Sequence, residues 1–169
     1  MKTASGALGC GVLALAVGIT TGCSGLRPYS SPDAPNLHIR TEATSGSVFS
    51  SVRADVGIYR VDPQCRIEYQ GTVDLDKPTV AVGIPTDRPS YLVFGFSSSS
   101  FLGGTRGGIS QETLLRPRPG YSYDIEATYK DDLYNVVIRE LHRASGARRA
   151  IDLQPLSACG SVAERPAAK

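Results

Sequence analysis

The sequence predicts an all-β fold, a small antiparallel β-sandwich of about seven to eight strands. Short runs in which apolar and polar residues alternate recur between turn-forming residues. No segment sustains the three- and four-residue apolar spacing of an amphipathic helix. One pair of adjacent runs has the pattern of a β-hairpin. Two sheets that bury their apolar faces against each other are the simplest arrangement for such a pattern.

The predicted hairpin is the clearest element. Its first strand spans residues 121–129, and its polar residues all fall on the opposite side from the apolar and aromatic ones, which are Tyr121, Tyr123, Ile125, Ala127 and Tyr129. The reversal is predicted at 130–133 and the return strand at 134–141, centred on Val136, Val137 and Ile138. The tyrosines could form a sugar-binding surface, but core packing explains their alternation more simply.

Six further strands complete the predicted sandwich. They are expected at 52–58, 65–73, 79–84, 91–96, 112–115 and 149–153. The run 91–96 is apolar on both faces, which predicts a central strand, and Gly71 is expected to mark a β-bulge. Strand order does not follow from these patterns, so immunoglobulin-like, transthyretin-like and small-barrel topologies all remain open.

The chain divides into four predicted segments: a signal peptide (1–22), a Pro- and Ser-rich tether (23–44), the β-sandwich (45–159) and a flexible tail (160–169). The leader has a positive Lys2 and an uncharged apolar run over 7–20. This run is shorter than the roughly 20 residues that a membrane-spanning helix needs. We therefore expect a cleaved leader and no transmembrane helix.

Thr21, Gly22 and Cys23 end the apolar run and are similar to the lipobox of bacterial membrane-anchored lipoproteins. The resemblance implies that Cys23 receives a diacylglycerol and, after cleavage, a palmitate-type acyl chain on its new amino group. Several acyl chains anchor a protein stably to a membrane. The residue after Cys23 is Ser24 and not an aspartate. In lipoproteins of Gram-negative bacteria, this resemblance implies export to the periplasmic face of the outer membrane. The alternative is plain secretion after cleavage nearby. The resemblance does not extend to the folded part.

Cys65 and Cys159 are the two thiols left in the mature domain, apart from Cys23. In an oxidising compartment they are a natural disulfide pair, and two isolated thiols are the alternative. Such a bridge would close a loop across most of the domain.

Composition and motifs argue against several function classes. Without Lys2, 17 of the 18 basic residues remain against 16 acidic ones, so no global positive field indicates nucleic-acid binding. The two histidines, His38 and His142, are far apart and no zinc motif is present. No Gly-x-Ser-x-Gly motif occurs. We predict no cofactor, no metal and no enzymatic activity; Cys65 as a nucleophile with His142 as its base is a weaker alternative.

Two stretches are candidate partner contacts. The first is a predicted long loop from Ser97 to Gly108, which contains Phe101, Leu102 and Arg106. The second is a basic cluster around the turn after the hairpin, formed with His142 by Arg139, Arg143, Arg148 and Arg149. A solvated surface with interspersed Glu140 and Asp152 is the simpler reading of the cluster.

These observations predict a non-enzymatic envelope lipoprotein whose β-sandwich is a structural or protein-binding module in the periplasm. The alternative function is an enzyme inhibitor or immunity-type protein that presents the Ser97–Gly108 loop to its target. An envelope hydrolase that uses Cys65 and His142 is the third hypothesis. The oligomeric state and the partner are not indicated by the sequence.

Overall fold

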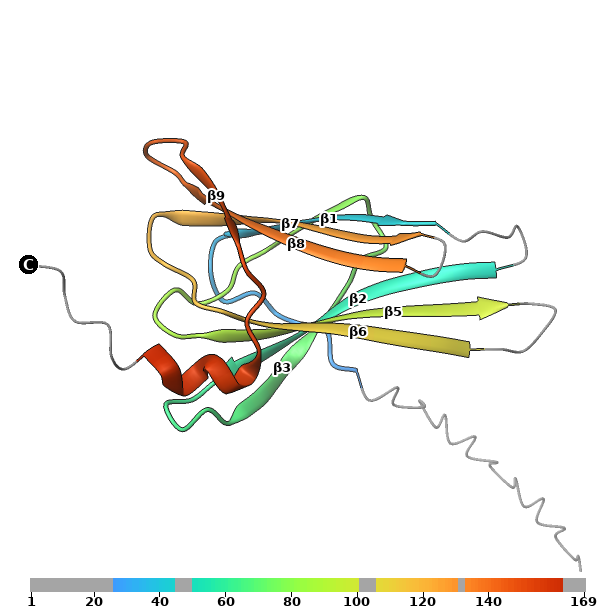
Figure 1. Ribbon diagram of the computed structural model, residues 1–169, viewed down its shortest axis with the longest axis horizontal. Coiled ribbons are helices and arrows are strands. Elements are labelled where there is room, and N and C mark those ends of the chain that lie inside the picture. Colours follow the sequence, from blue (N-terminus) through green and yellow to red (C-terminus); the bar gives the residue numbers. More distant parts are fainter. Residues whose placement is uncertain (1–25, 45–49, 101–105, 131–132, 163–169) are drawn as a thin grey trace, which may run out of the picture.

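The protein is a β-sandwich of two sheets, as predicted (Figure 1). The computed structural model describes residues 26–44, 50–100, 106–130 and 133–162. The first sheet has the order β4 (Thr79–Val82), β1 (Leu37–Ala43), β7 (Tyr121–Lys130), β8 (Leu133–His142) and β9 (Arg148–Ile151). The second has the order β3 (Ile67–Asp74), β2 (Ser50–Val61), β5 (Ser90–Ser100) and β6 (Arg106–Leu115). A 3₁₀ helix, η1 (Leu156–Val162), follows β9.

All strand pairs are antiparallel except β1 with β7, which run parallel. The strands lie lengthwise between two ends of the sandwich, left and right in Figure 1. The bridged end, on the left, contains Val61, Ser90, Leu115, Tyr121 and His142. The open end, on the right, contains Ala43, Ser50, Ser100, Arg106 and Lys130.

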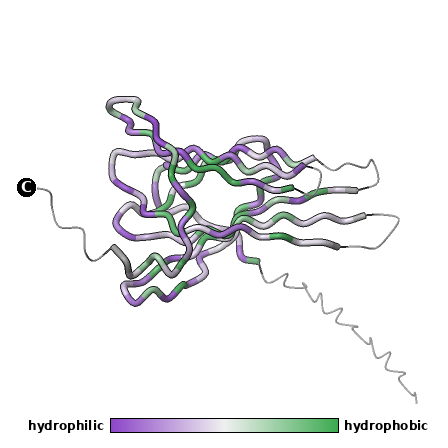
Figure 2. The backbone as a smooth tube through the Cα atoms, viewed as in Figure 1, coloured by the Kyte–Doolittle hydropathy of each residue, from purple (hydrophilic) through white to green (hydrophobic). Residues whose placement is uncertain are grey.

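The core fills the space between the two sheets with alternate residues of each strand. Figure 2 shows the pattern as hydrophobic and hydrophilic residues interleaved along the chain. The largest fully buried side chains come from both layers and include Leu37, Ile39, Phe94, Tyr123 and Ile125. Because successive side chains of a strand point to opposite faces, period-two patterning places one set in this core.

The clearest sequence predictions are confirmed. β7 and β8 form the predicted hairpin, with Lys130 opposite Leu133; residues 131–132 lie outside the described part. Strand β5 is central in its sheet. The pairing of β2 with β3 shifts between Ile58 and Tyr59, where Gly71 has φ 148°, so the predicted bulge is present. Tyr123 and Tyr129 belong to the core.

The predicted tether is wrong for the residues that the structure describes, because the chain is already packed against β3 at Arg27, whose carbonyl accepts from the Thr72 amide. Residues 37–43 form β1, a ninth strand between β4 and β7, and its Leu37 and Ile39 are fully buried. His38, which had no predicted structural setting, is therefore a strand residue. The prolines of this stretch precede β1 and leave its short alternating pattern intact. The folded domain begins well before residue 45.

The predicted long loop from Ser97 to Gly108 is also mostly strand. β5 continues to Ser100 and β6 begins at Arg106, with Ser97 opposite Gly108 and Ser99 opposite Arg106. Strand β2 explains the difference, because it pairs with β5 as far as Ser50 and Ser100. This pairing gives the serines of β5 a neighbouring strand to which their backbone groups can bond. Pairing with neighbours overrides the weak β-propensity of serine and glycine. Phe101 and Leu102 lie outside the described residues.

The predicted disulfide is confirmed. Cys65 and Cys159 are bonded, with their Cα atoms 5.8 Å apart. Cys65 has a left-handed backbone, with φ 60°, in the turn between β2 and β3. The bond holds η1 over the outer face of the second sheet, where Leu156 and Cys159 pack against Val61, Tyr91 and Leu114. Part of the predicted flexible tail, residues 160–162, belongs to this helix.

Candidate functional site

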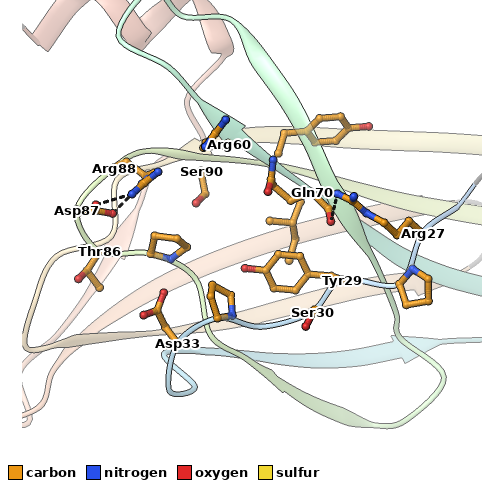
Figure 3. Close-up of a pocket in the computed structure, with 15 residues that line it drawn as sticks. Arg27, Tyr29, Ser30, Asp33, Arg60, Gln70, Thr86, Asp87, Arg88 and Ser90 are labelled. Carbon is orange, nitrogen blue, oxygen red and sulfur yellow. Dashed lines mark hydrogen bonds and ion pairs between the residues drawn. The ribbon is translucent and has the colours of Figure 1, made fainter.

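A pocket lies at the bridged end, under the segment that precedes β1. Its volume is about 770 Å³. We call residues 26–36 the N-terminal segment. This segment forms one wall, the end of β2 and Gln70 of β3 form a second, and the segment 83–89 between β4 and β5 forms a third (Figure 3). The polar side chains that line the pocket include Tyr29, Asp33, Tyr59, Arg60, Thr86 and Arg88.

The N-terminal segment is held against the edge of β3 by backbone hydrogen bonds. The Tyr29 amide donates to the Thr72 carbonyl at 2.9 Å, and the Thr72 amide donates to the Arg27 carbonyl at 2.8 Å. The Arg27 guanidinium also donates to the Tyr69 and Gln70 carbonyls, at 3.1 and 2.8 Å. These contacts make the segment a wall of the pocket with a defined position.

A second set of contacts joins the N-terminal segment to residues 83–89. The Ser31 hydroxyl donates to the Gly83 carbonyl at 2.9 Å and accepts from the Gly83 amide at 2.7 Å. The Asn36 side chain bonds both backbone groups of Ile84, at 2.8 and 2.9 Å, as a neighbouring strand would. Satisfied backbone groups of this kind allow an irregular segment to lie against the core.

The charges of the pocket are largely neutralised by near neighbours. Arg88 pairs with Asp87 at 2.7 Å, and Arg60 pairs with Glu68. Burial, with a smaller contribution from the Asp33 carboxylate, raises the pKa of the Tyr29 hydroxyl, which donates to the Gly83 carbonyl. A pocket of this kind offers polar contacts to a small ligand without attracting a strongly charged one.

The pocket contains no histidine or cysteine among its lining residues. His142 lies elsewhere, where its Nδ1 is 2.7 Å from the Ser145 hydroxyl and its ring packs beside Tyr121. Cys65 cannot be a free nucleophile, because its sulfur is bonded to Cys159. The proposed pairing of Cys65 with His142 for hydrolysis is therefore wrong.

The basic cluster does not form one patch. Arg139 pairs with Glu126 at 2.9 Å on the outer face of the first sheet. Arg149 binds Oε1 of the buried Glu140 at 2.7 Å, and Arg118 binds the same oxygen. Arg143 donates to the Pro35 carbonyl at 3.1 Å, while Arg148 lies exposed on β9. Most of these guanidinium groups thus make contacts within the domain.

The open end carries apolar residues that sequence reasoning did not select. Leu133 is 75% exposed and Tyr134 40% exposed, both at the start of β8. Ile109, on β6, is 37% exposed. Arg106, a predicted contact, begins β6. The sequence contained one indication of this surface: Leu133 ends the predicted tight reversal of the hairpin, a position at which an apolar side chain is typically exposed.

The comparisons with known proteins assign no family to the chain. No family model matches it, and no similar protein is found among curated ones. Within the described ranges, no group of three or more His, Cys, Asp or Glu residues is placed to hold a metal ion. The same ranges contain no helix with the length and apolar character needed to cross a membrane.

Proposed function

We propose that this protein is a non-enzymatic lipoprotein of the bacterial envelope, anchored through Cys23, and that its β-sandwich is a binding module. The observation that carries the proposal is the leader, in which an uncharged apolar run ends at Thr21, Gly22 and Cys23. The disulfide between Cys65 and Cys159 supports export, because such bonds persist in oxidising compartments. Ser24 supports delivery to the outer membrane.

The position of the fold makes the proposed anchor a short one. Arg27 already belongs to the packed part of the chain, because its carbonyl accepts a hydrogen bond from the Thr72 amide. Three residues separate Arg27 from Cys23, so the two Cα atoms are four steps of chain apart, which span at most about 14 Å. A lipidated protein would therefore hold its sandwich close to the bilayer surface. Its partners would be membrane-associated or would lie in the adjacent part of the periplasm.

The open end is the surface that we propose for partner binding. The N-terminal segment, η1 and the disulfide all lie away from it, and it presents Leu133 and Tyr134 to solvent. Exposed apolar side chains grouped at one end of a domain are typical of protein-binding surfaces. An inhibitor or immunity-type protein that presents the paired ends of β5 and β6 to an enzyme is the alternative function.

The anchor is tested with Cys23→Ser, with Cys10→Ser as the matched control. In bacterial cells that lipidate envelope proteins, the native chain and the Cys10→Ser variant should incorporate a labelled palmitate and sediment with the outer membrane. The Cys23→Ser variant should incorporate no label and lose its membrane association. Membrane retention of unlabelled Cys23→Ser, or an unmodified amino terminus on the native protein, would contradict the proposal.

The binding surface is tested by photo-crosslinking in intact cells. A photoreactive residue at position 133 should capture a partner protein, and one at position 67 should not, because Ile67 is 44% exposed at the bridged end. Capture of an enzyme whose activity falls on addition of the purified domain would favour the inhibitor function. Equal capture from both positions, or none from position 133, would remove the open end as the binding surface.

A further inference from the structure

The two sheets have four edges, and three of them are short or covered. β4 and β9 are each four residues long. The N-terminal segment covers β3 through its bonds to Tyr69, Gln70 and Thr72. The fourth edge, β6, is ten residues long. Exposed edge strands are templates for pairing with another chain, and natural proteins protect them.

Hydrogen bonds from the described residues cover only one half of the outer edge of β6. The Leu114 amide donates to the Gln154 carbonyl at 2.7 Å, and the Gln154 amide donates to the Thr113 hydroxyl at 3.0 Å. The Leu114 amide therefore points away from β5. Since residues of a strand alternate in the direction of their backbone groups, the amides and carbonyls of Glu112, Ser110 and Gly108 also point to the outer side. Within the described residues, they have no backbone partner there.

The uncovered half of β6 lacks the usual protections. It contains no proline or lysine, and its pairing with β5 runs from Arg106 to Leu115 without a shift in register. Gly107, Gly108, Ile109 and Ser110 are all exposed. Ile109 lies on the side that faces the other sheet, opposite Phe96 of β5. The ring of Tyr134, on β8, also lies beside Phe96, so an apolar rim borders this edge.

We propose that β6 pairs with β6 of a second copy of this chain, antiparallel and about a two-fold axis at Ile109. This register sets Gly108 against Ser110 of the second copy as a hydrogen-bonded pair. Arg106 is then set against Glu112, two residues of opposite charge. The pairing uses residues 106–112 and stops before Leu114, whose amide is already bonded to Gln154. The length of the free edge thus matches this register.

The register also explains the exposed isoleucine. At the two-fold axis, Ile109 of one copy lies beside Ile109 of the other as a non-hydrogen-bonded pair, in which side chains approach most closely. Both isoleucines become covered on the side that faces the other sheet. The second sheet becomes a continuous eight-stranded sheet across the two copies. Pairing over seven residues makes a small interface, so we expect a dimer that dissociates on dilution.

The first experiment measures the mass of the soluble domain by light scattering across a concentration series. The protein used is the mature chain with Cys23→Ser. It should shift from monomer to twice that mass as concentration rises. Ser110→Pro should remain monomeric, because proline removes the outward amide and leaves the bonds to β5 intact. Ser110→Ala keeps the amide and should dimerise like the parent. Circular dichroism confirms that each variant folds.

The second experiment tests the register with single cysteines in the same background. Ile109→Cys should form a disulfide-linked dimer under mild oxidation. Gln111→Cys alone should not, because two copies of position 111 lie about 13 Å apart in this register. A mixture of Gly107→Cys and Gln111→Cys should form the crossed dimer. A monomer at every concentration, or efficient linkage of Gln111→Cys to itself, would overturn the proposal. Neither experiment depends on lipidation.

Discussion

The bridged end and the open end of the same sandwich are built from the same strands but are stabilised differently. At the bridged end, separate segments of the chain are joined by the disulfide, by η1, and by the pairing of Glu140 with Arg118 and Arg149. The Arg116 guanidinium adds bonds to the Ala158 and Cys159 carbonyls, at 2.9 and 3.1 Å.

The open end relies on its backbone ladders. The strand residues that approach it from β5 and β6 are mainly serine and glycine, and Ser97, Ser99, Gly107 and Gly108 are exposed. A side-chain hydrogen bond joins Ser51 to Ser99 at 2.9 Å across two strands. The difference teaches that links between side chains and between distant segments concentrate at one end, which leaves the other as the surface that we propose for recognition.

The largest effect on stability is expected from breaking the disulfide. Cys159→Ser should lower the free energy of unfolding by about 2 to 5 kcal/mol, because the bond closes a loop with a sequence separation of 94 residues. Urea denaturation of the soluble domain measures the change. Reduction of the parent should give a similar loss. A loss below about 0.5 kcal/mol would show that the bridged end does not depend on the bond.

The next largest effect is expected from Gly83→Ala. A Cβ at this position would lie 2.0 Å from the Asp33 carbonyl oxygen, which is a backbone atom. The N-terminal segment would have to move, at a cost of about 1 to 3 kcal/mol. Gly160→Ala is the matched control, since a Cβ there meets nothing within 4 Å. Equal stability of the two variants in urea would contradict the close packing of this segment.

Alkaline pH should weaken the bridged end through Tyr91. Burial, followed by its hydrogen bond to Glu112, raises the pKa of this tyrosine to about 12 from the ordinary value of 10.0. The folded state therefore keeps the proton between these values while the unfolded state loses it. Stability should be unaffected by this group below pH 10 and should fall as pH rises from about 10 to 12.

Urea denaturation at a series of pH values measures this fall. Tyr91→Phe should flatten the part of the profile above pH 10, because phenylalanine does not titrate. Glu112→Gln should lower the pKa of Tyr91 only in part, since burial is the larger cause. An unchanged alkaline profile in Tyr91→Phe would assign the fall to other groups.

The smallest effect is expected at the open end. Ser99→Ala removes an exposed hydrogen bond to Ser51 and should change the free energy of unfolding by no more than about 0.5 kcal/mol. The same urea experiment measures it. A loss comparable to that of Gly83→Ala would show that the open end also maintains the fold, and the contrast between the two ends would fail.

The strictly alternating run over 121–129 predicted its strand, its hairpin and its buried face, because local patterning and tertiary packing agree there. The pattern of β1 is shorter, and the prolines before it favoured a tether. Its pairing with β7, from which it is separated by nearly half of the chain, decided the outcome. The serine and glycine residues before and after 101–105 became strands for the same reason.

The candidate sites were less predictable than the strands. The arginines 139, 143, 148 and 149 are close in sequence but do not lie together. Because side chains alternate along a strand, Arg139 lies on the outer face of the first sheet beside Glu126, whereas Arg149 binds the buried Glu140. The wall of the pocket comes from the N-terminal segment and from residues 83–89, which no sequence pattern relates. Such sites are formed by pairs of residues that only folding brings together.

Sequence patterning alone determined the class of fold, the β7–β8 hairpin and the identity of the disulfide pair, because alternation and cysteine count are local or compositional properties. The tertiary structure decided where the domain begins, which edges are covered and which end is open. These features depend on contacts between distant segments, such as the hydrogen bonds of the Thr72 backbone with Arg27 and Tyr29. Such contacts stabilise the fold only once both segments are in place.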